Sequence, residues 1–185
     1  MGSQLPTISQ PLTINGPGQE LLTLDAGNGA DGIFGTQDGY RIFDISDGDS
    51  SNEIRVALNG LTLTGGDVSE TASGGGAIRS RESLVVSDST ISGNTAGPAP
   101  NFNDLSGGGG GGIQNSGSLQ VIRSTISNNL TGQHGGGGGI FSSGTLTVLE
   151  TSIQDNATRG FFAGDSSFGS RSGGCLLYTS PSPRD

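Results

Sequence analysis

The sequence lacks several features that common protein classes need. It contains no lysine and no tryptophan, and only 30% of its 185 residues are hydrophobic. Such a composition is poor material for a compact core with long helices. Eight arginines face seventeen acidic residues, which makes the net charge −9 at pH 7. Because phosphate binding needs a basic stripe, we expect no nucleic acid among the partners.

Long apolar runs are missing as well. No stretch of about 18 apolar residues, the length that crosses a bilayer, occurs in the chain, so we predict no membrane span. The first six residues have neither the basic nor the apolar segment of a signal peptide. We therefore expect the reading frame, or the fragment, to begin downstream of the true N-terminus.

Cysteine occurs once, at Cys175, in a terminal segment (175–185) whose composition differs from the rest. This segment resembles the translation of a transposase-type sequencing adapter along its whole length. We interpret it as an assembly artefact and exclude it from the fold, the alternative being a natural Ser/Pro-rich tail. The remaining chain then offers no disulfide, thiolate ligand or cysteine nucleophile.

A repeat is the main feature that the sequence does have. Three seventeen-residue segments, 78–94, 113–129 and 140–156, align without gaps. Within the first, Leu84 and Val86 alternate with their neighbours, the period of a strand with one buried face. Short strands with polar corners at this repeat length predict stacked coils of parallel strands. The matched apolar positions are Ile78/Ile113/Ile140, Leu84/Leu119/Leu146, Val86/Val121/Val148 and Ile91/Ile126/Ile153.

Polar residues recur in the same register. Hydroxyls and opposite charges at matched positions favour neighbouring strands that stack directly. An asparagine closes each unit, at a corner where Asn can take the left-handed conformation and bond to the next coil, so we predict a structural asparagine ladder. The matched sets are Ser89/Ser124/Thr151, Thr90/Thr125/Ser152, Asp88/Arg123/Glu150 and Asn94/Asn129/Asn156.

Earlier coils are less regular. Ile54, Val56 and Leu61 fit the frame of Leu84, Val86 and Ile91 at an offset of thirty residues. We also predict strands at 11–14, 21–24 and 40–43 from their alternating apolar residues. Length varies between repeats only after each Asn, so the insertions 95–112 and 130–139 should leave from one corner of the stack.

Several motifs resemble a known group of proteins. The segment 75–78 (GGAI) is similar to the GGA(I/L/V) motif of polymorphic outer-membrane protein repeats, and the segments that end at Asn94, Asn129 and Asn156 resemble their FxxN motif with Ile in place of Phe. The segments 12–18, 60–66 and 89–94 resemble the right-handed β-helix region of large bacterial surface proteins, including those with a CSLREA-type N-terminal segment. The resemblance covers about residues 5–160 and implies export and a surface or adhesive role. The second and third repeats lack the Ala of the motif, and neither an autotransporter barrel nor a CSLREA segment is present, which leaves the anchoring mechanism open.

Calcium is the first ligand to consider. The segment 26–35, with Asp31, resembles one nonapeptide of a calcium-binding β-roll, but such rolls need tandem copies, so an ordinary Gly-rich loop is the alternative that we favour. The acidic stretch from Asp44 to Glu53 fails the EF-hand spacing, which favours a solvated turn.

Other candidate residues also point to structure rather than chemistry. His134 is the only histidine and has no Cys or second His near it, so we expect an exposed loop residue rather than a zinc ligand or a catalytic base. The Gly runs 107–112 and 135–139 lack the Lys-Ser/Thr of a phosphate loop, and we interpret them as linkers between coils.

An enzyme is the serious rival interpretation, because pectin-active enzymes use this fold. Arg79, Arg81 and Asp88 lie in one repeat, but Gln114, Ser116 and Arg123 replace them in the next, and there is no Trp to stack on sugar rings. Fold alone does not decide function. We therefore predict no catalytic, cofactor-binding or metal-binding residue, with a polysaccharide lyase or hydrolase as the alternative.

These observations combine into one prediction. The fold class is all-β, a right-handed parallel β-helix of pectate-lyase-like architecture over residues 1–160, with regular coils at about 54–156 and a Gly/Ser-rich continuation or disordered segment at 161–174. We expect a structural, adhesin-type section of an exported bacterial protein, located outside the cell or at the outer-membrane surface. Its expected partners are a surface polysaccharide or a host or cell-surface ligand, and the sequence leaves its oligomeric state open.

Overall fold

The computed structural model describes residues 4–29, 31–33, 38–68, 74–97, 109–132, 136–159, 170–172 and 175–177. Regular structure within these residues is entirely β, arranged as four five-stranded sheets. No helix among them is long and apolar enough to cross a membrane. The all-β prediction is therefore confirmed.

The sheets contain the following strands in spatial order. The first has β1 (Leu12–Asn15), β4 (Arg55–Asn59), β8 (Ser83–Ser87), β12 (Ser118–Ile122) and β16 (Thr145–Leu149). The second has β2 (Thr23–Asp25), β5 (Thr62–Thr64), β9 (Thr90–Ser92), β13 (Thr125–Ser127) and β17 (Ser152–Gln154). The third has β6 (Asp67–Val68), β10 (Thr95–Ala96), β14 (Leu130–Thr131), β18 (Ala157–Arg159) and β19 (Ser170–Ser172). The fourth has β3 (Phe43–Ile45), β7 (Ile78–Ser80), β11 (Ile113–Asn115), β15 (Ile140–Ser142) and β20 (Cys175–Leu177).

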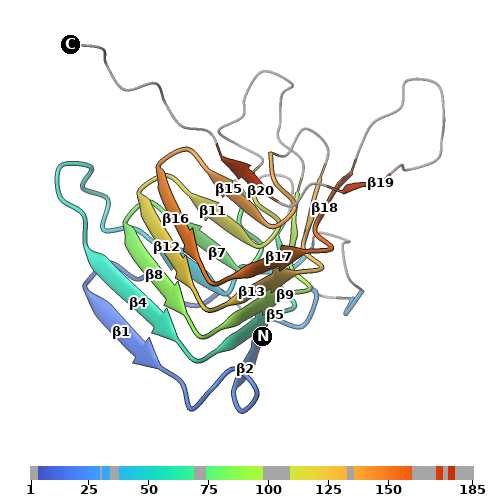
Figure 1. Cartoon of the computed structure of the whole chain (residues 1–185), viewed down its shortest axis with the longest axis horizontal. Coiled ribbons are helices and arrows are strands. Elements are labelled where there is room, and N and C mark those ends of the chain that lie inside the picture. The colour runs from blue at the N-terminus through green and yellow to red at the C-terminus, as the bar shows by residue number, and fades with distance from the viewer. Residues whose placement is uncertain are drawn as a thin grey trace, which may run out of the picture.

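From β4 to β15, each turn of the chain contributes one strand to each sheet before the next turn begins, whereas the first turn adds β1, β2 and β3 and no described strand of the third sheet. Consequently β4, β8, β12 and β16 lie side by side, as Figure 1 shows from cyan to orange. Neighbouring strands pair in parallel, apart from the antiparallel pair of β18 and β19. The repeated parallel coils that the sequence predicts are therefore present.

The core is a set of apolar columns that run through the stack. Ile113 pairs with Ile78 on one side and with Ile140 on the other, and all three are fully buried. Leu119 and Val121 pair in the same way with their counterparts in β8 and β16. Each coil thus buries its apolar side chains against its neighbours, and the register predicted for residues 78–156 is confirmed.

The predicted upstream frame is wrong by two residues. Val56 pairs with Leu84 and Leu58 pairs with Val86, an offset of 28 residues rather than thirty. Side chains on a strand alternate with a period of two, so a two-residue shift leaves the apolar face unchanged and the pattern cannot detect it. The earlier strands also begin later than predicted, since β2 starts at Thr23 and β3 at Phe43.

The predicted insertions begin too early in the chain. Their first residues, 95–96 and 130–131, form β10 and β14, which pair with each other in the third sheet. Two-residue strands are too short to show a periodic pattern. Both segments still leave after the third sheet and return at the fourth, so the prediction of a common corner is confirmed.

The left-handed residues at the corners are not the predicted asparagines. Gly93, Asn128 and Asp155 have positive φ angles of 63°, 55° and 53°. They precede the ladder residues by one position, so the turn is made before the ladder asparagine rather than by it. A second left-handed corner, between the first and second sheets, has Asp88, Arg123 and Glu150 at φ angles of 50°, 45° and 49°.

The terminal segment also contributes a strand. β20 belongs to the segment 175–185 that we excluded from the fold, and its backbone pairs in parallel with β15. The adapter interpretation of that segment stays a prediction. Residues 161–169, 173–174 and 178–185, like His134, lie outside the described residues.

Candidate functional site

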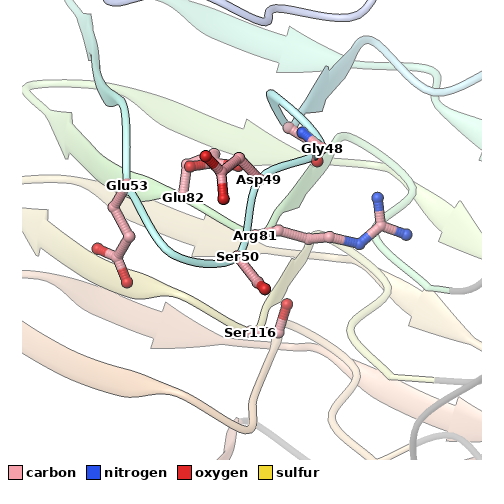
Figure 2. Close-up of a pocket in the computed structure, with 8 residues that line it drawn as sticks. Gly48, Asp49, Ser50, Glu53, Arg81, Glu82 and Ser116 are labelled. Atoms are coloured by element: carbon pink, nitrogen blue, oxygen red, sulfur yellow. Dashed lines mark hydrogen bonds between the residues drawn. The ribbon is translucent and has the colours of Figure 1, made fainter.

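A polar pocket of about 460 Å³ lies beside the irregular loop that joins β3 to β4. Figure 2 shows the loop crossing over the corner between β7 and β8, with Glu53 and the guanidinium of Arg81 on opposite sides. The lining residues are Ser46, Gly48, Asp49, Ser50, Glu53, Arg81, Glu82 and Ser116. The pocket is therefore built by the acidic stretch 44–53 and by two successive coils.

Glu82 positions this loop. Its side chain is buried, and its carboxylate accepts hydrogen bonds from the backbone N–H groups of Asp47 (3.1 Å) and Ile54 (3.0 Å). A buried carboxylate with two N–H donors forms charge-assisted hydrogen bonds, which are stronger than neutral ones. Glu82 thus ties both ends of the segment 47–54 to the coil beneath it.

Short-range hydrogen bonds shape the loop between these ends. The N–H of Gly48 donates to Ser46 Oγ (3.2 Å), and the N–H of Asp49 donates to Asp47 Oδ1 (2.8 Å). Asp49 in turn accepts from the hydroxyl (2.6 Å) and the N–H (2.9 Å) of Ser51, and these bonds lower the pKa of its carboxyl. Such side-chain to backbone bonds are typical of polar turns. The stretch thus folds as the turn that its spacing favours.

An ion pair lies next to this loop. Asp44 in β3 and Arg79 in β7 occupy paired positions, and two hydrogen bonds of 2.9 and 2.6 Å join their side chains. Burial raises the pKa of Asp44, but the hydrogen bonds and the charge of Arg79 outweigh it, so the net pKa is lowered. Asp44 is therefore a structural partner of Arg79 rather than a free carboxylate.

Arg41 is a further buried cation near this pair. Its guanidinium donates to the carbonyl oxygens of Gly75 (2.9 Å) and Gly74 (2.7 Å). Burial first, and then the charge of Arg79, lowers its pKa to about 10, so Arg41 remains protonated at neutral pH. Arg41 therefore holds in place the glycine-rich segment 74–76, which leads into β7.

The pocket offers several kinds of hydrogen-bonding group. Asp49 and Glu53 supply exposed carboxylates, Arg81 a guanidinium, and Ser50 and Ser116 hydroxyls. Such groups can bind a polar ligand, whereas an aromatic platform for sugar rings is absent from the lining. Within the described ranges, no three His, Cys, Asp or Glu side chains converge in a way that could hold a metal ion.

The structure separates the predicted candidate residues. Arg79 bonds to Asp44, Arg81 lines the pocket, and Asp88 forms an exposed ion pair with Arg123 (2.7 Å). Asp31 accepts from the N–H of Ile33 (2.8 Å) in an exposed turn, while residues 30, 34 and 35 of the calcium-like motif are outside the described ranges.

The Gly runs are packing elements rather than simple linkers. Gly111 accepts from the N–H of Gly76 (2.8 Å), and the N–H of Gly112 donates to the carbonyl of Gly139 (3.0 Å). A Cβ atom at Gly109 would overlap the ring of Phe141 in β15. Only residues without side chains allow successive runs to approach this closely.

Glu82 and Arg41 were missed as functional positions by the sequence analysis. Arg41 precedes β3, and Glu82 lies at the corner between β7 and β8. Neither residue recurs at the matching positions of the other repeats. A repeat pattern gives weight to residues that recur, so it passes over a polar residue that serves one irregular loop.

The chain matches no protein-family model, and searches of curated proteins and of solved structures find no significant match.

Proposed function

We propose that the chain is a section of a right-handed parallel β-helix that forms a rigid, non-catalytic part of an exported bacterial surface protein. Handedness is inferred from a general rule, since about 98% of connections between parallel strands of one sheet are right-handed. The four sheets, in which strands of successive turns pair in parallel apart from β18 with β19, are consistent with that architecture.

The observation that carries the structural role is the pair of side-chain ladders. Asn94, Asn129 and Asn156 are buried and joined in series, with Asn129 Nδ2 donating to Asn156 Oδ1 (2.9 Å). A second ladder runs in parallel, because the N–H of Ser89 donates to Ser124 Oγ (3.2 Å) and that of Ser124 donates to Thr151 Oγ1 (3.2 Å). The three coils that contain β8, β12 and β16 are thereby held to one another at two corners, which favours a stiff rod.

The variable side of the rod supports an adhesive role. The segments that follow β10 and β14 differ in length, and both connect the third sheet to the fourth. A rigid scaffold that presents variable loops on one side is a common arrangement for binding. The ligand that we propose is a surface polysaccharide or another host or cell-surface molecule.

Surface exposure is the direct test of this proposal. Intact cells of the source bacterium should be labelled by an antibody raised against the purified chain, and protease added outside the cells should remove the label. An antibody against a cytoplasmic protein is the control. Labelling only after the cells are broken would refute the surface role.

A carbohydrate-active enzyme is the second candidate, favoured by the carboxylates and Arg81 in the pocket. The test is incubation of the chain with acidic polysaccharides and calcium, with detection of unsaturated products and of new reducing ends. We expect neither. Turnover that disappears in Arg81→Ala and Glu53→Gln would replace the structural role by an enzymatic one.

A further inference from the structure

The edge formed by β16 and β17 leaves part of the core column uncovered. Val148 is 37% exposed, whereas its partner Val121 in the preceding coil is fully buried. Leu146, the other residue of β16 on this face, is only partly buried, whereas its partner Leu119 is 1% exposed. Among the described residues β16 and β17 end their sheets, while the neighbouring β15 and β18 pair onward with β20 and β19.

Both ladders are open at the same edge. Inside the stack, each ladder residue donates its backbone N–H to a side-chain oxygen of the following coil, as Ser124 does to Thr151 (3.2 Å) and Asn129 to Asn156 (3.0 Å). In the part of the chain that the structure describes, the N–H groups of Thr151 and Asn156 have no such acceptor. A covering segment would need a hydroxyl and an amide oxygen at these two positions.

Charge adds a third requirement. Arg123 bonds to Asp88 in the coil before it, and Glu150 occupies the same corner in the coil after it. Glu150 forms no ion pair within the described ranges. A basic side chain at the matching position of a covering segment would complete the alternation of charges.

We propose that this edge, formed by β16, the corner 150–151 and β17, binds a twelve-residue strand–corner–strand segment with the repeat's own pattern, added in parallel as the two-strand half of a further coil. The pattern is that of Ser118–Asn129, with apolar residues matching Leu119, Val121 and Ile126. The added segment would repeat the interface that already joins neighbouring coils. Backbone hydrogen bonds to β16 and β17 would supply affinity, and the apolar column would supply specificity.

A second copy of the chain stacked head to tail fits this edge less well. Its first coil has seven residues, 16–22, between β1 and β2, whereas two residues separate β16 from β17. The carbonyl of Leu22 accepts a hydrogen bond from the N–H of Thr62, as the carbonyl of Ser89 does from Thr125. Leu22 therefore occupies the position of the hydroxyl ladder in the first coil. A leucine at that position has no hydroxyl for the N–H of Thr151.

The test is binding of a synthetic, fluorescently labelled Ser118–Asn129 peptide to the full chain, followed by anisotropy. We expect saturable binding. Ser124→Ala in the peptide should weaken it about five-fold, the effect of one lost hydrogen bond. Asn129→Ala should weaken it more, because an asparagine at this position makes three hydrogen bonds to the preceding coil. The Ser83–Asn94 peptide keeps the hydroxyl and the amide but places Asp88 beside Glu150, so it should bind more weakly than Ser118–Asn129.

Protein variants locate the site. Val148→Asp should lose binding by about ten-fold or more, because it places a charge in the apolar column. Thr147→Asp, an exposed neighbour on the opposite face of β16, is the matched control and should bind normally. Circular dichroism verifies that both variants fold.

Three results would overturn the proposal. One is the absence of saturable binding, and another is equal affinity for the Asn129→Ala peptide, which would indicate non-specific apolar contact. The third is concentration-dependent self-association of the chain in sedimentation that Val148→Asp removes. That result would assign the edge to a second copy.

Discussion

Asn129 Oδ1 accepts two hydrogen bonds from Asn94, one from the backbone N–H at 3.1 Å and one from Nδ2 at 3.0 Å. The Nδ2 group of Asn129 also donates to the carbonyl of Ile91 (2.9 Å). One buried side chain therefore joins three successive coils, since it also contacts Asn156. This relationship sets the first prediction.

Asn129→Ala should lower the free energy of unfolding by about 2–4 kcal/mol, because it leaves several buried donors and acceptors of the neighbouring coils without partners. Denaturant unfolding followed by circular dichroism measures the change. Asn128→Gly is the control, since Asn128 is exposed and its φ of 55° suits glycine. An equal loss in both variants would show that the turn, and not the ladder, matters.

The pair of Asp44 and Arg79 predicts a dependence on pH. The folded-state pKa of Asp44 lies below the unfolded value of about 3.9, so the pair stabilises fully above that pH and less as pH falls through the folded pKa. The stability gap between wild type and Asp44→Asn should be constant from neutral pH down to about 5 and close below about 4.

The exposed pair of Asp88 and Arg123 supplies the matched control for this experiment. Both side chains are about half exposed, at 50% and 53%, so solvent screens their attraction. Asp88→Asn should change the unfolding free energy much less than Asp44→Asn at neutral pH. Equal changes in the two variants would show that burial of the Asp44 pair does not increase its contribution to the unfolding free energy.

Glu82→Gln should loosen the loop that borders the pocket while the coils stay folded. The amide oxygen can still accept one of the two N–H groups, but its NH₂ group faces the other donor. Hydrogen exchange at the amides of Asp47 and Ile54 should become about ten-fold faster or more, given the strength of bonds to a charged group. Glu53→Gln, on the exposed side of the pocket, should leave both rates unchanged.

Gly109→Ala should destabilise the chain by about 1–3 kcal/mol, the usual cost of overpacking. The added methyl group would overlap the ring of Phe141. In a Phe141→Ala background the same substitution should cost clearly less, because the overlap is gone. Thermal unfolding of the four proteins in this cycle measures the coupling, and strictly additive effects would contradict the contact.

The regular coils could be predicted closely, and the irregular ones could not. From Ile78 onward three copies of one pattern constrain each other, so the columns and both ladders follow from alignment. Upstream, Val56 and Leu58 have only the alternation of one strand to place them, and alternation is unchanged by a shift of two residues. The short strands β10 and β14 lie below the length at which any period is visible.

The sequence by itself determined the all-β class, the stacking register of residues 78–156 and the chemistry of each ladder rung, because these depend on recurring local patterns. Only the tertiary structure decided that Glu82 holds both ends of the loop 47–54, that Asp44 meets Arg79, and that glycine runs lie against Phe141. These contacts occur once and join residues about thirty positions apart, so they depend on which neighbouring coil an irregular segment lies against. The pocket is built from contacts of this second kind.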